Sequence, residues 1–277
     1  MEKYIDAHTH IHFPAYEADK EEVLKRAKEA GVRMITVGTQ NSTSESAVNF
    51  AKQNLGWVWA TAGFHPGHFS AEWHHDKNEQ SEEAKEIFDP VRLKEIASAP
   101  EVVAVGECGL DFFRISPEDL ETRKMQKEGF IAQMKVSSEL GKPLMIHCRA
   151  AFPELIEIFE QHRNLLVSPN PGAIHFFSGN LEEAKKLLGL GFVFTFGGVV
   201  TFSRDYDEVI KFIPVENILP ETDAPYVAPH PYRGKRNEPA FVIESAKKLA
   251  ELKGLSMEEF AEISFKTAER VFNLKSI

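Results

Sequence analysis

Short apolar segments, many of them rich in β-branched or aromatic residues, recur along the whole chain. Runs of this kind are typical of buried β-strands. Their spacing leaves room for a helical crossover between one strand and the next. The eight candidate strands are Tyr4–Ala7, Met34–Val37, Trp57–Phe64, Val102–Val105, Leu144–Ile146, Ala173–Phe177, Phe192–Phe196 and Asn217–Leu219.

The segments between and after these strands show helical periodicity with charged faces. Three of them end just before a glycine, at Gly31, Gly141 and Gly191, as helices commonly do. The clearest predicted helices are Glu21–Ala30, Glu118–Leu140, Leu181–Leu190, Pro239–Lys253 and Ser256–Phe272.

Eight strands that alternate with helices predict an α/β fold in which a parallel sheet closes into a (β/α)8 TIM barrel. An open doubly wound sheet is the alternative. The chain has 277 residues and no Gly/Ser/Pro-rich linker or tandem repeat, which favours a single domain over residues 1–277. Residues 66–90 form the longest stretch without a strand. We expect a loop and the start of a helix there, in a position that can shape a substrate pocket.

Composition narrows the classes of function. A hydrophobic content of 43% can supply a large core, and a net charge of -10 argues against tight, sequence-independent binding to nucleic acid. Any nucleic-acid contact must therefore be local. No signal peptide is visible, and the longest apolar stretch, Phe192–Phe202, is too short to span a membrane. Cys108 and Cys148 are interpreted as small packing residues in a cytoplasmic protein, and no obligate protein partner is evident.

Histidines and carboxylates follow six of the eight predicted strands, at the ends where barrels carry their functional groups. His8 and His10 are two residues apart and therefore point to the same side of the first strand. A single histidine is better explained as an ordinary hydrogen-bonded side chain. Six coincident strand ends favour a metal site instead. The residues are His8, His10, His65, Glu107, His147, His175 and Asp223.

Imidazole and carboxylate ligands together suit Zn(II), Mn(II) or a related transition ion, whereas Mg(II) usually prefers oxygen ligands and retained waters. Zn(II) and Mn(II) are the expected metals, and Mg(II) or another divalent ion is the alternative. A catalytic zinc usually takes three protein ligands and keeps one position open. Four histidines and two carboxylates exceed that number, so we expect two divalent ions per chain. The six expected ligands are His8, His10, Glu107, His147, His175 and Asp223.

Seven ordered motifs lie between Asp6 and Pro239. They are Asp6–His10, Gly63–Pro66, Gly106–Asp111, Ile146–Arg149, His175–Gly179, Glu221–Tyr226 and Arg233–Pro239. With these motifs the chain resembles the TatD family of metal-dependent hydrolases and deoxyribonucleases, within the amidohydrolase-like group of barrels. Strand four offers a glutamate and no adjacent lysine, which separates the chain from dihydroorotase-like and phosphotriesterase-like barrels.

The resemblance implies a division of the ligands between two ions. His8, His10 and Asp223 would hold the first ion, His147 and His175 the second, and Glu107 would bridge them. It also implies a deoxyribonuclease that cleaves phosphodiester bonds with a metal-activated water. Asp223 is the expected general base, and Glu107 is the second expected catalytic residue.

Other motif residues are expected to contact the substrate or to orient the ligands. Basic side chains among them suit phosphate, although a basic run is more often a solvated surface. For the polar ones, loop capping or turn packing is the alternative. These residues are His65, Asp111, Arg149, Ser178, Arg233, Lys235, Arg236 and Asn237. Histidines without a strand-end position are expected outside the site, namely His12, His68, His74 and His75.

Ordinary structural roles compete with the metal site. Glu107 could form a salt bridge with Arg149 or Arg114, and Asp223 could cap a helix, although prolines soon after it oppose helix formation. At the level of function, the alternatives to DNA hydrolysis are a metal-dependent esterase, such as a D-aminoacyl-tRNA deacylase, and a nonenzymatic metal-binding or nucleic-acid-binding module. DNA, or an aminoacyl-tRNA, is the expected partner.

Overall fold

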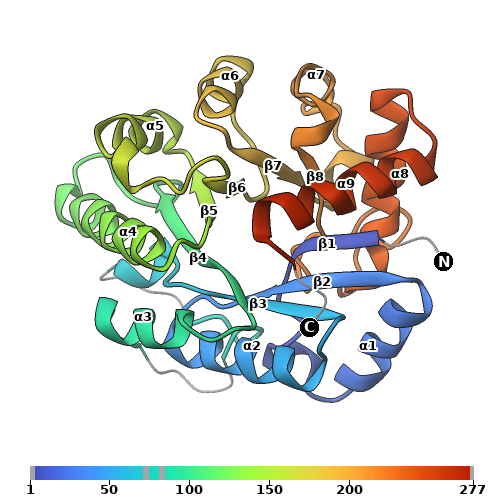
Figure 1. Ribbon diagram of the computed structural model, residues 1–277, viewed down its shortest axis with the longest axis horizontal. Coiled ribbons are helices and arrows are strands. Elements are labelled where there is room, and N and C mark those ends of the chain that lie inside the picture. Colours follow the sequence, from blue (N-terminus) through green and yellow to red (C-terminus); the bar gives the residue numbers. More distant parts are fainter. Residues whose placement is uncertain (1–3, 71–74, 81–84, 275–277) are drawn as a thin grey trace.

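Eight parallel strands form the centre of the protein and follow one another in chain order (Figure 1). The computed structural model describes residues 4–70, 75–80 and 85–274. A parallel bridge between Thr9 and Ala224 joins the two edges of the sheet, so the sheet closes. The predicted (β/α)8 barrel is confirmed, and the open doubly wound sheet is wrong. The strands are β1 (Tyr4–Thr9), β2 (Val32–Val37), β3 (Val58–Ala62), β4 (Val102–Asp111), β5 (Leu144–Arg149), β6 (Gly172–Ile174), β7 (Val193–Phe196) and β8 (Ile218–Pro220).

Helices follow the strands and surround the sheet (Figure 1). They are α1 (Lys20–Glu29), α2 (Asn41–Gln53), α3 (Pro90–Ala97), α4 (Leu120–Leu140), α5 (Phe152–Gln161), α6 (Leu181–Gly189), α7 (Asp207–Phe212), α8 (Val242–Lys253) and α9 (Met257–Phe272). Gly31, Gly141 and Gly191 adopt positive φ angles of 72°, 63° and 94° just after α1, α4 and α6. This is the left-handed conformation expected where a helix ends. None of the described helices combines the length and apolar character needed to cross a membrane.

Two strand ends differ from the prediction in a way that matters for the site. β4 continues beyond Val105 to Asp111, because its register with β5 shifts between Val105 and Cys108 and pairing then resumes. β6 ends at Ile174, so His175 is the first residue after the strand. The described part of residues 66–90 contains a short 3-10 helix, Pro66–Phe69, and leads into α3 at Pro90, as expected, while residues 71–74 and 81–84 lie outside the described residues.

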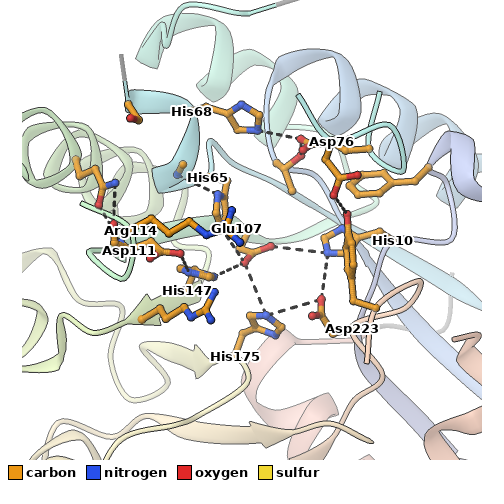
Figure 2. Close-up of a pocket in the computed structure, with 18 of the residues that line it drawn as sticks. His10, His65, His68, Asp76, Glu107, Asp111, Arg114, His147, His175 and Asp223 are labelled. Atoms are coloured by element: carbon orange, nitrogen blue, oxygen red, sulfur yellow. Dashed lines mark hydrogen bonds and ion pairs between the residues drawn. The ribbon is translucent and has the colours of Figure 1, made fainter. Parts of the chain in front are cut away.

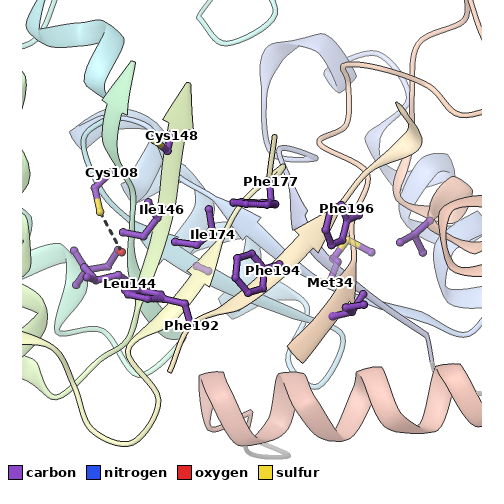
Figure 3. Packing of buried hydrophobic residues seen from close by; sticks show 14 of the residues in the cluster. Met34, Cys108, Leu144, Ile146, Cys148, Ile174, Phe177, Phe192, Phe194 and Phe196 are labelled. Atoms are coloured by element: carbon purple, nitrogen blue, oxygen red, sulfur yellow. Dashed lines mark hydrogen bonds between the residues drawn. The ribbon is translucent and has the colours of Figure 1, made fainter. Parts of the chain in front are cut away.

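An apolar layer packs between the sheet and the helices. Phe194 and Phe196 lie on the outward side of β7 and pack with neighbouring aromatic and aliphatic side chains in this layer (Figure 3). Cys108 and Cys148 are buried in the same layer as free thiols, so their interpretation as packing residues is confirmed. The intervening residue of β7, Thr195, is fully buried and its hydroxyl contacts Glu221.

The barrel interior is filled by a second apolar cluster near the beginnings of the strands. Ile5, Trp59 and Met145 belong to it, together with Phe265 and Phe272 of α9. Helix α9 thus closes one end of the barrel with side chains that exclude water. Polar side chains line the opposite end of the barrel, where the strands end.

Candidate metal centre

The six predicted ligands converge at the open end of the barrel, where the strands end. Figure 2 labels five of them, His10, Glu107, His147, His175 and Asp223. Closure of the sheet brings the first and last of them together. The backbone N–H of Asp223 donates to the carbonyl of His8 over 2.9 Å, and the N–H of His10 donates to the carbonyl of Ala224 over 2.7 Å. His8 and Asp223, which are far apart in the chain, are therefore held by adjacent backbone segments.

His8, His10 and Asp223 form one compact set of donor atoms. The Nε2 atoms of His8 and His10 are 3.1 Å apart. Asp223 Oδ1 lies 3.5 Å from Nε2 of His10 and 3.8 Å from Nε2 of His8. A tetrahedral ion with bonds of about 2.1 Å separates its ligand atoms by about 3.4 Å. The three spacings bracket this value, so the set has dimensions that fit a small divalent cation.

Glu107 lies in the middle of the cluster, and its two oxygens face different groups. Oε2 is 3.3 Å from Nε2 of His8. Oε1 is 2.9 Å from Nδ1 of His147, 3.6 Å from Nε2 of His65 and 3.8 Å from Nε2 of His175. A carboxylate placed in this way can serve two neighbouring cations at once. Burial raises the pKa of a carboxyl, but the surrounding imidazoles, His8 foremost, hold the pKa of Glu107 well below its usual value.

His65 and Asp111 complete the side of the cluster around His147. His65 contacts the ring of His147 edge-on, with centroids 4.4 Å apart, and therefore lies inside the donor cluster. Asp111 Oδ2 is 3.0 Å from Nε2 of His147. Burial alone would lower the pKa of His147, but hydrogen bonds with Asp111 and Glu107 outweigh it and raise this pKa to about 9. Asp111 therefore orients His147, as a carboxylate beside a metal ligand commonly does.

Glu221 orients His175 in the same way, although it was not among the predicted site residues. It is fully buried, and its Oε2 lies 2.9 Å from Nδ1 of His175. Its Oε1 accepts a hydrogen bond from the backbone N–H of Phe176 over 3.0 Å. Burial lowers the pKa of His175, but the charges of Glu221 and Glu107 outweigh it and raise this pKa to about 10. The available signal was spacing, since Glu221 and Asp223 are separated by one residue in a motif.

Replacing Glu221 with glutamine is expected to weaken metal binding by roughly 10- to 100-fold, the usual effect of losing a carboxylate behind a ligating imidazole. The amide keeps the shape of the side chain but removes the charge that orients His175. Competition with a chromophoric chelator measures the change. Glu216→Gln, at the opposite end of β8, is the matched control. An unchanged affinity in Glu221→Gln would contradict the orienting role.

Metal uptake is expected to release protons at neutral pH. In the metal-free protein the pKa values of His147 and His175 are raised to about 9 and about 10, so both rings are charged at pH 7. A metal ligand must be the neutral imidazole, and binding therefore displaces about two protons per chain at pH 7. The release should fall as the pH passes 9 and vanish above 10. Calorimetric titration with metal in buffers of different ionisation enthalpy counts these protons, and pH-independent release would contradict the assignment.

A cavity of about 540 Å³ opens above the cluster. Arg114 and Arg149 line it beside the donor atoms, and Arg114 extends toward the cluster next to Asp111 (Figure 2). His68 also lines the cavity, contrary to the expectation that it lies outside the site. The 3-10 helix Pro66–Phe69 turns this ring inward, where its Nε2 lies 2.9 Å from Oε1 of Glu79.

Two other histidines expected outside the site, His12 and His75, are not among the described residues that line this cavity. His12 bonds through Nδ1 to the hydroxyl of Thr36 over 2.7 Å and borders a separate hollow. His75 bonds to the carbonyl of Gln80 over 2.8 Å. His74 lies outside the described residues.

Five residues predicted near the substrate do not line the cavity. Arg236 pairs with Asp19 over 2.6 Å, and the side-chain amide of Asn237 donates to backbone carbonyls of the loop that carries Asp223. Arg233 stacks on Phe202 with 3.7 Å between the guanidinium carbon and the ring centroid. Ser178 and Lys235 are exposed. Arg236 and Asn237 therefore brace the loop after β8, because their polar groups are already engaged.

Within the described part of the chain, Glu107 forms no salt bridge with an arginine and Asp223 caps no helix, so both structural alternatives are wrong. Glu107 forms its ion pairs with histidines there, and neither Arg114 nor Arg149 is among its partners. Asp223 is followed by a turn in which the N–H of Tyr226 donates to its carbonyl, and the next helical residues begin at Pro239. Asp223 is therefore not a helix cap.

Comparison with known proteins agrees with the geometry. The family model described as TatD-related DNase matches residues 5–273. The chain belongs to this TatD-related family. The predicted resemblance is thereby confirmed, and with it the class of metal-dependent hydrolase.

The similarity to other TatD-related proteins extends over nearly the whole chain. "Uncharacterized metal-dependent hydrolase YabD" of Bacillus subtilis is 36% identical over 97% of this chain and 98% of its own length. "3'-5' ssDNA/RNA exonuclease TatD" of Pantoea vagans is 34% identical over 94% of this chain and 95% of its own length. The crystal structure of YJJV, a TatD homolog from Escherichia coli K12, superposes with a TM-score of 0.82 at 28% identity and 98% coverage of both chains.

Proposed function

We propose that this TatD-related protein is a deoxyribonuclease that hydrolyses phosphodiester bonds in DNA with two divalent ions. The position of Glu107 carries the proposal. Its two oxygens face two groups of nitrogen and oxygen donors at the base of a cavity, within 3.8 Å of His8, His147 and His175. This arrangement suits two neighbouring cations better than one.

The donor chemistry supports specific ligand sets. His8, His10 and Asp223 would hold the first ion with one oxygen of Glu107. The other oxygen of Glu107 would join His147 and His175 at the second ion, with His65 near enough to contribute. Imidazole nitrogen and carboxylate oxygen favour Zn(II) or Mn(II). Bound ions of this kind lower the pKa of water and neutralise charge on phosphoryl oxygens.

Asp223 is the proposed general base because of its exposure to the cavity. Its side chain is 18% exposed, whereas that of Glu107 is 5% exposed and that of His8 is fully buried. A proton accepted by Asp223 can therefore pass to solvent in the cavity. Burial raises the pKa of its carboxyl, but the hydrogen bond with His10 and the neighbouring imidazoles outweigh burial and lower this pKa. Asp223 is thus ionised and ready to accept a proton at neutral pH.

Arg114 and Arg149 are the proposed phosphate contacts. Both line the cavity, and neither forms an ion pair within the described part of the chain. Guanidinium groups that line a cavity without a carboxylate partner suit a phosphate ligand. The name of the Pantoea vagans relative supports a single-stranded substrate. The two buried free thiols are in keeping with the proposed cytoplasmic location.

One assay separates this function from its alternative. Labelled single-stranded DNA, duplex DNA, single-stranded RNA and D-aminoacyl-tRNA are incubated with metal-reconstituted protein. Shortening of the single-stranded DNA supports the proposal. Release of the amino acid alone would overturn it in favour of a deacylase, and no reaction would favour a nonenzymatic binding module. Elemental analysis after reconstitution tests the ion number, and fewer than two ions per chain would count against the two-ion site.

A further inference from the structure

An exposed aromatic ring lies beside Arg149, one of the two arginines that line the cavity. Phe113 is 57% exposed, although phenylalanine is usually buried in folded proteins. The guanidinium carbon of Arg149 lies 3.6 Å from the centroid of its ring. This distance is that of a stacked contact, so one face of Phe113 is covered by Arg149. Because so much of the residue remains exposed, a flat ligand can still reach the ring.

The turn that carries Phe113 is fixed to the metal centre by backbone hydrogen bonds. The N–H of Phe113 donates to Asp111 Oδ1 over 3.0 Å, and the other oxygen of that carboxylate bonds to His147. The N–H of Phe112 donates to the carbonyl of Arg149 over 2.9 Å. Phe112 is buried, and Arg123 stacks on it with 4.5 Å between guanidinium carbon and ring centroid. Phe113 is therefore held in a set position relative to the donor cluster.

The charges around the ring point to an anionic ligand that also has a flat face. Arg114 follows Phe113 in the chain, and both Arg114 and Arg149 line the cavity. Within the described residues neither guanidinium is neutralised by a carboxylate. A nucleotide unit combines the two required features, since its phosphate suits the arginines and its base can stack on an aromatic ring.

We propose that Phe113, backed by Arg149, is a stacking platform for a nucleobase of single-stranded nucleic acid, adjacent to the phosphate bound by Arg114 and Arg149. The proposal rests on the proposed function and extends it to strand selection. A base in a duplex is already stacked and paired, so it must leave the helix before it can contact the ring. The platform therefore favours single strands and frayed ends over intact duplexes.

Binding of a fluorescein-labelled single-stranded deoxythymidine 10-mer tests the platform by fluorescence anisotropy. The metal-reconstituted Asp223→Asn protein serves as the background, because its slow hydrolysis leaves most of the oligonucleotide uncleaved during the binding measurement. Adding Phe113→Ala is expected to weaken binding by about 5- to 140-fold, the range for loss of one base–aromatic stack. Phe113→Trp should retain tight binding. An oligomer with abasic sites in place of the bases should bind equally well with and without Phe113→Ala.

Leu120→Ala is the matched control, because Leu120 is also an exposed apolar residue, at 71%. Equal losses on the base-bearing and abasic oligomers, or no loss in Phe113→Ala, would overturn the platform. A loss of oligonucleotide affinity in Leu120→Ala equal to that in Phe113→Ala would also overturn the platform. Hydrolysis by the protein without the Asp223 substitution is measured separately. Absence of hydrolysis together with base-dependent binding would reject the proposed function and leave the platform standing.

Discussion

Glu107→Gln is expected to lower kcat for a single-stranded oligonucleotide by roughly 10³-fold or more, because it disturbs both ligand sets and the activation of water. Glutamine has the shape of glutamate but carries no charge, and one of its two oxygens becomes an NH2 group. That group would face either His8 or His147 and could not act as a ligand. The variant should also bind fewer than two ions. Steady-state kinetics and elemental analysis measure the two effects.

The matched control for this change is Glu101→Gln, which alters the residue just before β4 at the opposite end of the barrel. It should keep both the rate and the ion content. In metal-free Glu107→Gln, the pKa values of His147 and His175 should fall, since each is raised in part by the charge of Glu107. Titration by nuclear magnetic resonance detects that fall. Full activity with two bound ions in Glu107→Gln would refute the central role of this carboxylate.

Asp223→Asn is expected to lower kcat by about 10²- to 10⁴-fold at saturating metal, which is the range for loss of a general base. Asparagine is a better test here than alanine. Asp223 has a φ angle of 55°, in the left-handed region that asparagine tolerates and alanine disfavours. Alanine would therefore combine the loss of the carboxylate with a strained backbone. The amide oxygen of asparagine can still occupy the ligand position.

Asp205→Asn, an exposed residue in the segment between β7 and α7, is the control for Asp223→Asn and should leave kcat unchanged. Metal titrations accompany the kinetics, so that weaker binding of the first ion is distinguished from loss of the base. If saturating metal restored the wild-type rate to Asp223→Asn, Asp223 would be a ligand only. A rate that stays low with two ions bound supports its role as the base.

Unusual backbone conformations just after the strands orient the side chains of the site. Ala150, Phe176 and Asp223 have φ angles of 54°, 45° and 55°, and each lies beside or within the site. Positive φ in residues other than glycine is uncommon and is often retained where function requires a particular backbone. At Phe176 the cause is visible, because its N–H donates to the carboxylate of Glu221, which also holds His175.

The sequence alone predicted the barrel and the identity of the residues at its open end. Alternating apolar strands and amphipathic helices were sufficient, because the side chains of a closed parallel sheet face either the surrounding helices or the barrel interior, and both environments are apolar. The functional side chains of such a barrel lie at the carboxyl ends of its strands. The polar residues after each predicted strand could therefore be identified as candidate site residues without coordinates. His8, Glu107 and Asp223 were found in this way.

Only the tertiary structure decided which of these side chains contact one another. Glu221 and His65 lie close to the predicted ligands because β8 closes against β1 and because the 3-10 helix after β3 begins at Pro66. The pairing of Arg236 with Asp19 depends on a loop after β8 reaching the segment before α1, a contact that sequence spacing does not encode. Strand periodicity specifies the direction of a side chain within its own strand. Distances between side chains from different strands and loops are set by sheet closure and loop packing, which involve residues far apart in the chain.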